Sequence, residues 1–296
     1  MIELPEEFYR EEVRSGHTVT ASTKKIWAVE LELLSEFDRV CRECGLPYYA
    51  DQGTLLGTVR HGGFISWDDD IDLIMFRKDY DRLIHECGDK FKDPFFLQTA
   101  YSEKDYFRGH AQLRKSDTCA AIPSEAYNSK INQGMFLDIF VMDNIPDNED
   151  DLKKEIDELN AYHDVMTILT QRDIKGSALT KLRCKYGILK RRLKYGNVAS
   201  VYRKTEEVVK AVPDTGLVDK LLFWHDVKSV KKIRSEWYDK TVWLDFENTK
   251  LPAPFMYDEV LKAQFGKDYM TPIKGTAFHP DLIIDTERSY KEVLGT

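Results

Sequence analysis

Hydrophobic and polar positions repeat along the chain with two different periods, so the sequence predicts both helices and strands. Helical spacing of apolar residues predicts a helix over residues 23–44, with Ser22 or Thr23 as its N-cap and Gly45 past its end. Short helices are expected near residues 54–60 and 78–90. Apolar runs predict strands at residues 47–50, 70–75, 94–99, 111–115 and 134–142. Because strands and helices interleave up to about residue 145, we expect an α/β or α+β sheet domain.

The pattern changes after an acidic turn at residues 144–151, which we take as the domain boundary. Beyond it the sequence is largely helical, with a few short strands. Helices are predicted over residues 150–172, 177–194, 198–212, 216–238 and 257–265, and one or two strands over 241–255. We therefore divide the chain into a lead-in (1–22), a catalytic core (23–148) and a largely helical region with short strands (149–296).

Composition and charge narrow the classes of function. The 296 residues carry a formal net charge of −8, whereas a nucleic-acid binder is more often basic, so no nucleic-acid partner is expected. No apolar run is long enough to span a membrane, and residues 1–12 lack the apolar core of a signal peptide, so we expect a cytoplasmic protein. The five cysteines are odd in number and scattered, which is typical of reduced thiols.

Four acidic residues crowd the start of the predicted strand at residues 70–75. Carboxylates at this density repel one another and lose hydration, so we expect a cation beside them. Residues two apart in a strand project from the same face, which directs Asp70 and Asp72 to one side. Paired carboxylates suit a hard cation such as Mg²⁺ or Mn²⁺. Asp68 and Asp69 precede the strand and are expected to tune the site or cap a turn.

Two further features extend this site. Gly53 and Thr54 lie in a turn before a predicted helix, where glycine allows close approach and helix-start amides favour phosphate. Asp138 lies inside an apolar strand, where a bare charge is costly. If this strand lies beside residues 70–75, Asp138 would face the same edge, as a third metal ligand or as the base that accepts a hydroxyl proton. The alternative is a buried salt bridge to a lysine or arginine.

This combination resembles the nucleotidyltransferase fold, and more closely the LicD family of phosphocholine and polyol-phosphate transferases, to which fukutin-related proteins belong. The resemblance is carried by residues 51–72 (DQGTLLGTVRHGGFISWDDDID), by Leu113-Arg114-Lys115, by residues 136–146 (FLDIFVMDNIP) and by later matches that include His279. It covers about residues 20–280.

The resemblance implies an α+β fold with a nucleotidyltransferase-like mixed β-sheet core flanked by helices. It also implies an Mg²⁺-dependent transfer of phosphocholine from CDP-choline to a sugar hydroxyl of a teichoic acid or lipopolysaccharide precursor. Asp70, Asp72 and Asp138 would hold the metal, and Gly53 and Thr54 would contact the donor phosphates. The helical region would shape the site for the glycan or lipid-linked glycan acceptor. Alternatives are transfer of ribitol or glycerol phosphate from a CDP donor to a capsular glycan, nucleotidyl transfer from an NTP to a small molecule, and a catalytically inactive binding protein.

Residues around the proposed donor site are candidates for substrate binding. Arg60 has a planar guanidinium suited to phosphate, and Gln52 adjoins the glycine turn. Lys115 follows a short strand and is as well explained by a surface position as by a phosphate contact.

Residues 174–205 hold ten Lys or Arg and no acid. We favour a solvated helix face balanced by the acidic residues 147–158. The alternative is a peripheral contact with anionic lipid at the inner face of the membrane, or with a polyanionic acceptor.

Overall fold

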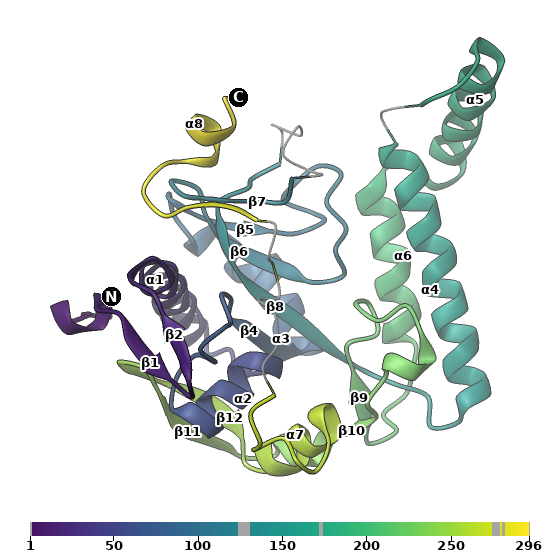
Figure 1. Ribbon diagram of the computed structural model, residues 1–296. Helices are drawn as coiled ribbons and strands as arrows, with labels where there is room; N and C mark the ends of the chain where they lie inside the picture. Colours follow the sequence, from purple (N-terminus) through teal and green to yellow (C-terminus); the bar gives the residue numbers. More distant parts are fainter. Residues whose placement is uncertain (1, 124–130, 172–173, 274–278, 280–281, 296) are drawn as a thin grey trace.

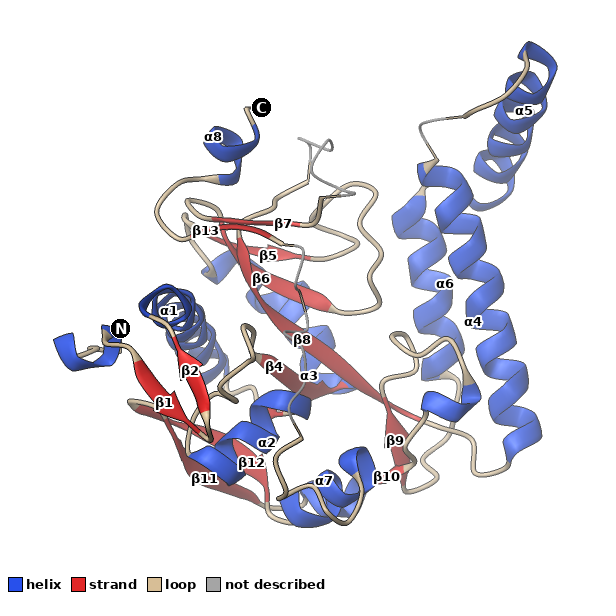
Figure 2. Ribbon diagram, in the orientation of Figure 1, coloured by secondary structure: helices blue, strands red, loops and turns tan. Residues whose placement is uncertain are grey.

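The computed structural model describes residues 2–123, 131–171, 174–273, 279 and 282–295, and every structural statement below concerns these residues. They form an α+β fold, as predicted, in which a curled mixed sheet is flanked by helices (Figures 1 and 2). The strands are β1 Glu12–Arg14, β2 His17–Val19, β3 Tyr49–Ala50, β4 Asp72–Phe76, β5 Phe95–Gln98, β6 Ala111–Lys115, β7 Cys119–Ala121, β8 Met135–Asn144, β9 Leu217–Asp219, β10 Ile233–Arg234, β11 Thr241–Phe246, β12 Thr249–Pro254 and β13 Ile283–Asp285. The α-helices are α1 Ala21–Cys44, α2 Gln52–His61, α3 Arg77–Arg82, α4 Glu149–Thr170, α5 Ala178–Tyr195, α6 Val198–Lys210, α7 Tyr257–Phe265 and α8 Tyr290–Leu294.

Strand β8 is the centre of the main sheet. It pairs with β4 in parallel on one side and with β6 antiparallel on the other, and its last residues pair with β9. Apart from its last residue, β8 is buried throughout, which is why its sequence is an almost continuous apolar run. The pairing of β4 with β8, which the site prediction required, is confirmed.

Helix α1 covers this sheet and fixes the acidic loop before β4. Thr20 is its N-cap, one turn earlier than predicted, because the Thr20 hydroxyl accepts from the backbone N–H of Thr23. Gly45 ends the helix at φ 62°, a left-handed conformation that glycine adopts without strain. The fully buried indole of Trp27 donates from Nε1 to the backbone oxygen of Asp68 at 2.9 Å.

Helices α4 and α6 pack side by side beyond the edge of the sheet, and α5 lies at their far end (Figure 1). A buried ion-pair network joins this helical pair to the sheet. Arg77 donates to both carboxylate oxygens of Asp143 in β8 at 2.7 Å and to Glu206 of α6 at 3.0 Å. Among the described residues, no helix combines the length and the apolar composition needed to cross a membrane.

The region after residue 212 differs most from the prediction. The helix expected over residues 216–238 is wrong: β9 and β10 occupy its ends, with irregular chain between them. Gly216 starts this segment at φ 73°, and the following residues pair with the end of β8. Pairing with the end of β8 has therefore outweighed a weak helical pattern in the sequence. The sheet thus continues past the predicted boundary near residue 148.

The helix expected over residues 78–90 is present. It runs as α3 to Arg82 and continues as a π-helical turn, Leu83–Cys87, and a 3-10 turn, Gly88–Lys90. One other expectation needs correction. Cys44 and Cys87 form a disulfide between the end of α1 and these turns, whereas the sequence analysis expected reduced thiols. The two cysteines are 43 residues apart, so only the packing of α1 against the turns brings them together. Cys41 is buried and free.

Glu155 of α4 provides a test of the fold. Burial and the nearby Asp143 raise its pKa to about 8, and neither of its carboxylate oxygens has a hydrogen-bond partner. Since the folded pKa lies above the unfolded value, ionisation costs stability progressively as the pH rises from about 4.5 to 8. Glu155→Gln should therefore be more stable than the wild type by about 1–2 kcal/mol at pH 8 and equally stable at pH 4.5, measured by urea unfolding.

The matched control is Asp157→Asn, because Asp157 lies on the same helix, is exposed and is not among the groups that shift the pKa of Glu155. It should leave the pH dependence unchanged. A stability difference between Glu155→Gln and the wild type that did not vary with pH would contradict this account of Glu155.

Candidate functional site

Three carboxylates from two neighbouring strands meet at one edge of the sheet. Asp72 opens β4 and lies opposite Asp138 of β8 in the parallel register. Asp70 lies two residues before Asp72, outside the strand, yet an oxygen of each of the three carboxylates is within 4.8 Å of the other two. The strand was expected to begin at Asp70, so its start differs, but the predicted convergence of the three side chains is present.

Burial and mutual repulsion dominate the electrostatics of these carboxylates. Burial, then the neighbouring Asp72, raise the pKa of Asp70 well above its ordinary value. Burial, then Asp138, do the same for the pKa of Asp72. Burial also raises the pKa of Asp68, to about 6. The folded chain therefore holds more carboxylates here than it can keep ionised by itself.

Asp138 has different surroundings. Burial would raise its pKa, but His110, Gln112 and then Arg108 lower it below the ordinary value. Gln112 of β6 lies opposite Asp138 in the sheet and donates to its Oδ1 at 2.6 Å, and His110 Nε2 lies 3.3 Å from the same oxygen. Arg114 in turn donates to Gln112 at 2.6 Å and so orients its amide. Asp138 is thus the carboxylate of this group that the protein keeps ionised.

A fourth acid lies beneath the same edge. Glu30 of α1 is 2% exposed, and its Oε2 has no hydrogen-bond partner among the described residues. Burial, then Asp69 and Asp138, raise its pKa well above the ordinary value. An unpartnered buried carboxylate beside three converging oxygen ligands is the environment that a hard divalent cation would neutralise. The residues present therefore fit Mg²⁺ or Mn²⁺ at Asp70, Asp72 and Asp138.

Helix α2 starts at this edge, and Gln52 and Gly53 of its first turn line the cavity described below. A Cβ atom at Gly53 would lie 2.6 Å from Asp68 Oδ2, so the glycine lets the acidic loop approach the helix. Gln52 adopts φ 44°, which is unusual for a residue with a side chain.

Thr54 is placed differently from the prediction. Its side chain is buried, and its hydroxyl accepts from the backbone N–H of Asp72 at 2.8 Å. Thr54 therefore ties α2 to the start of β4 and is not among the cavity residues. Its role in this structure is to position Asp72.

Arg60 lies near the other end of α2 and lines the cavity. Its guanidinium donates to His61 Nε2 at 2.9 Å and to the backbone oxygen of Tyr269 at 3.0 Å. Burial lowers its pKa from the ordinary value. Tyr269, far along the chain, thus helps to orient a cationic side chain toward the cavity.

Lys115 does not reach the site. Its ammonium group pairs with Asp117 at 2.8 Å, and the residue is not among those that line the cavity. The cause is the alternation of β6, which directs Gln112 and Arg114 to the cavity and Lys115 to the other face. Arg114, its neighbour in the same sequence motif, lines the cavity instead.

A buried ion pair at the base of the site had no signal in the sequence. Asp51, which is fully buried, pairs with Lys220, which follows β9, and accepts from Gln264 Nε2 of α7 at 2.6 Å. Lys220 is also one of the groups that lower the pKa of Asp72. The helix predicted over residues 216–238 gave no indication of this contact, because the position of Lys220 depends on the pairing of β9 with β8.

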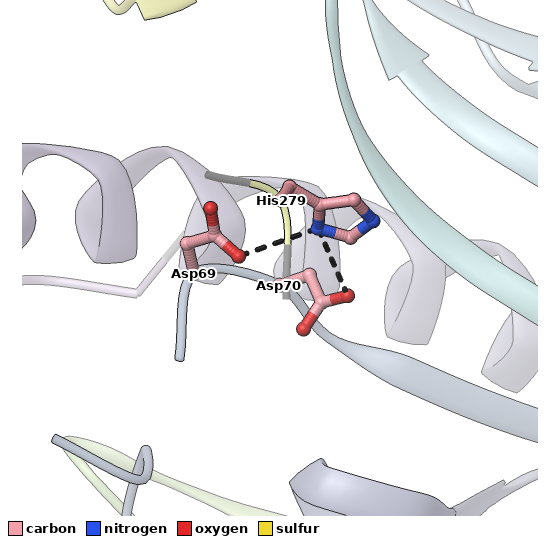
Figure 3. Close-up of side chains that lie close together, drawn as sticks. All are labelled: Asp69, Asp70 and His279. Carbon is pink, nitrogen blue, oxygen red and sulfur yellow. Dashed lines mark hydrogen bonds and ion pairs between the residues drawn. The ribbon is translucent and has the colours of Figure 1, made fainter. Parts of the chain in front are cut away.

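His279, for which the sequence suggested no role, also reaches the acidic loop (Figure 3). Its Nδ1 lies 3.4 Å from Asp69 Oδ1 and 3.7 Å from Asp70 Oδ2. Burial lowers its pKa, but the neighbouring acids, Asp69 first, raise it to a net value above the ordinary one. A protonated His279 offsets part of the negative charge at this end of the cluster, and Asp69, Asp70 and His279 form a second group with metal-ligating atoms.

The carboxylates open into a cavity of about 800 Å³. Its wall combines cationic and aromatic side chains with the acidic edge. The cationic ones are Arg60, Arg108 and Arg114, and the aromatic ones include Trp67, Phe136, Phe140, Phe223, Trp224 and Phe265. This size is within the range of small-molecule sites. A phosphorylated ligand would meet cations, an acidic edge and flat apolar surfaces in one enclosure.

Residues 45–158 match the family described as LicD/FKTN/FKRP, nucleotidyltransferase domain. This part of the chain, less than half of its length, is therefore similar to the nucleotidyltransferase domain of that family. A lipopolysaccharide cholinephosphotransferase LicD of Haemophilus influenzae is 33% identical over 116 residues, which cover 39% of this chain and 42% of the relative. The chain therefore matches less than half the length of that relative.

The matched residues 45–158 contain the three carboxylates, the start of α2 and the Gln112–Arg114 pair. Lys220, Tyr269 and His279 lie outside the matched residues and yet contact the same site. Segments outside the matched residues therefore complete the site.

For Asp72→Asn we expect opposite effects on thermal stability, relative to the wild type, in the absence and in the presence of a metal ion. In EDTA at pH 8 the variant should melt at a higher temperature than the wild type, because it removes one repelling buried carboxylate. On addition of Mg²⁺ or Mn²⁺ the wild type should gain stability and the variant little, because a cation stabilises the state that binds it. Each kcal/mol corresponds to about 2–4 °C in melting temperature.

Asp245→Asn is the control, since that side chain is 80% exposed and far along the chain in β11. It should respond to metal as the wild type does. A metal-induced shift that Asp72→Asn retains in full would exclude Asp72 as a ligand.

The buried pair of Asp51 and Lys220 predicts a stability cycle. Lys220→Met should destabilise the protein by about 3–5 kcal/mol, because Asp51 would keep a buried charge without a counter-ion. Asp51→Asn with Lys220→Met should recover most of this loss. Denaturant unfolding of the four proteins measures the coupling, and additive effects of the two substitutions would rule out the pairing.

Proposed function

We propose that this protein transfers phosphocholine from CDP-choline to a sugar hydroxyl of a teichoic acid or lipopolysaccharide precursor, with Mg²⁺ as cofactor. The observation that carries the proposal is the convergence of Asp70, Asp72 and Asp138 at the edge of a cavity that also holds arginines and aromatic rings. The name of the relative from Haemophilus influenzae supports the choice of donor group and acceptor class.

The donor phosphates have a place between the start of α2 and the cationic wall. The backbone of Gln52 and Gly53 faces the cavity at the positive end of the helix dipole. Arg60 can present its planar guanidinium to phosphate oxygens, held in position by Tyr269. Gly53 permits the close approach that a larger residue would block.

The donor's trimethylammonium group requires aromatic faces. Phe140, Phe223 and Trp224 pack together at one side of the cavity, with ring centroids of 4.9 Å between Phe223 and each of the other two. The ammonium of Lys220 already lies 5.3 Å from the centroid of Phe140. Lys220 already occupies part of this aromatic surface, so the preference for choline over the neutral ribitol or glycerol rests on the relative's name as well as on the remaining aromatic face.

Asp138 is the best candidate for the base. It is the carboxylate whose pKa is lowered, and Gln112 fixes its orientation. In the proposed step the sugar hydroxyl oxygen attacks the β-phosphorus of CDP-choline in line with the leaving group. The hydroxyl proton passes to Asp138, the bond from phosphorus to the bridging oxygen breaks, and CMP leaves.

Asp70 and Asp72 would hold the cation, and Asp138 would either complete the ligand set or keep the role of base. When bound, Mg²⁺ supplies positive charge that stabilises the phosphate oxygens as CMP departs. His279 offsets the negative charge of Asp69, and Arg114 orients the amide of Gln112.

A donor competition tests the proposal. The protein is incubated with Mg²⁺, a glycan acceptor, and CDP-choline, CDP-ribitol, CDP-glycerol or ATP, and CMP and pyrophosphate are quantified. Acceptor-dependent CMP release is expected from CDP-choline. Asp138→Asn should lower the rate by about 10²–10⁴-fold, the range for loss of a catalytic acid–base group. Asp72→Asn should also lower the rate, because it removes a proposed metal ligand.

The rival reactions give different products. CMP from CDP-ribitol or CDP-glycerol in preference to CDP-choline would change the donor alcohol. Pyrophosphate from ATP would replace the proposal with nucleotidyl transfer. Asp245→Asn serves as the control and should keep wild-type activity, because this exposed residue lies outside the cavity.

A further inference from the structure

Helix α5 carries an apolar stripe that nothing in the described structure covers. Five large apolar side chains recur at helical spacing on it, and each is at least 53% exposed. They are Leu179, Leu182, Tyr186, Leu189 and Leu193. Steps of three and four residues place such side chains on one face of a helix. An uncovered stripe of this length on a surface helix indicates an interaction surface.

The opposite face of α5 is the one that contacts the protein. Cys184, Ile188 and Tyr195 are only half-buried, and Ile188 and Tyr195 pack against the hydrophobic core. Tyr195 meets Tyr162 of α4 with ring centroids 6.4 Å apart. At about 100° per residue, these three residues lie on the face of α5 opposite the apolar stripe, so the stripe points away from the helical pair. None of the residues that line the catalytic cavity belongs to α5.

Basic side chains border the stripe on both sides. The helix contains seven Lys or Arg and no acid: Lys181, Arg183, Lys185, Lys190, Arg191, Arg192 and Lys194. At about 100° per residue, Lys181, Lys185 and Arg192 fall along one border, and Arg183, Lys190 and Lys194 along the other. Long basic side chains in this position can extend past an apolar surface to reach anionic groups.

The acidic segment that was expected to balance this charge lies elsewhere. Asp150 and Asp151 are in the first turn of α4, about 18 Å along the helix from Tyr162, where Tyr195 at the end of α5 makes its contact, and α5 lies at the far end of α4 (Figure 1). Among the described side chains, no ion pair joins a basic residue of α5 to an acid; Lys153 and Lys154 pair with acids within α4. The solvated face that we favoured from the sequence does not account for the exposed leucines.

We infer that α5 is a membrane-surface helix that binds anionic lipid headgroups. Its apolar stripe enters the boundary between headgroups and acyl chains, and the two basic borders contact lipid phosphates. Charge decides between the candidate occupants. A second copy of α5 would bring seven cations against seven, and a soluble polyanion would leave the leucines in water. An anionic bilayer satisfies both features of the helix.

The test is flotation of the purified full chain with vesicles of phosphatidylcholine alone or with 30 mol% phosphatidylglycerol, at about 0.1 M salt. The protein should partition onto the anionic vesicles and not onto the neutral ones. Lys190→Gln with Lys194→Gln should weaken partitioning about thirtyfold, since each basic residue near an anionic surface contributes about fivefold. The matched control, Lys153→Gln with Lys154→Gln on α4, should bind as the wild type does.

The stripe has its own variant. Leu182→Gln with Leu189→Gln preserves helix propensity but should weaken partitioning about tenfold or more, because less apolar surface is buried. Val13→Thr is its control, because Val13 is exposed in β1, at a distance from α5. All four variants should keep the wild-type melting temperature and donor turnover, because α5 contributes no residue to the cavity.

Three results would overturn the inference. One is wild-type protein that fails to float with anionic vesicles. Another is partitioning that the α5 variants retain in full. The third is a concentration-dependent dimer, seen by analytical ultracentrifugation, that Leu182→Gln with Leu189→Gln abolishes while vesicle binding is absent. That last result would identify a second copy of the chain as the occupant.

Discussion

The parallel pairing of β4 with β8 sets the central constraint on this protein, because it places Asp72 opposite Asp138 on one face of a buried sheet. Two carboxylates in register, with Asp70 and Glu30 close by, cost free energy in the absence of a cation. The surrounding structure holds them there regardless: Thr54 fixes the backbone of Asp72, Gln112 fixes Asp138, and Trp27 fixes the acidic loop. Rigid support of a repelling group is a feature of functional sites.

Local patterns in the sequence predicted this arrangement well where the chemistry is local. The apolar runs located β4 and β8, and an acid inside an apolar strand identified Asp138. Prediction failed where the outcome depends on contacts distant in sequence. The alternation of β6 selected Arg114 over Lys115, and the pairing of β9 with β8 placed Lys220 under Asp51. The disulfide of Cys44 with Cys87 likewise follows from the packing of α1.

The segments after residue 212 complete the site that residues 45–158 form in part. Three of these segments reach it: Lys220 pairs with Asp51, the backbone of Tyr269 contacts Arg60, and His279 contacts the acidic loop. Helix α5, which lies at the far end of the helical pair (Figure 1), carries exposed leucines and seven basic residues. If the acceptor is lipid-linked, as proposed, a helix on the bilayer would hold the cavity near it.

The most direct test of the central claim is an anomalous diffraction measurement on crystals grown with Mn²⁺ and CDP-choline. Our account predicts a manganese peak among the carboxylates of Asp70, Asp72 and Asp138, at about 2.1–2.2 Å from their oxygens, with donor phosphate oxygens on its open side. A peak that involved only Asp69, Asp70 and His279 would contradict it. So would the absence of a peak at the three carboxylates in crystals whose other Mn²⁺ sites are fully occupied.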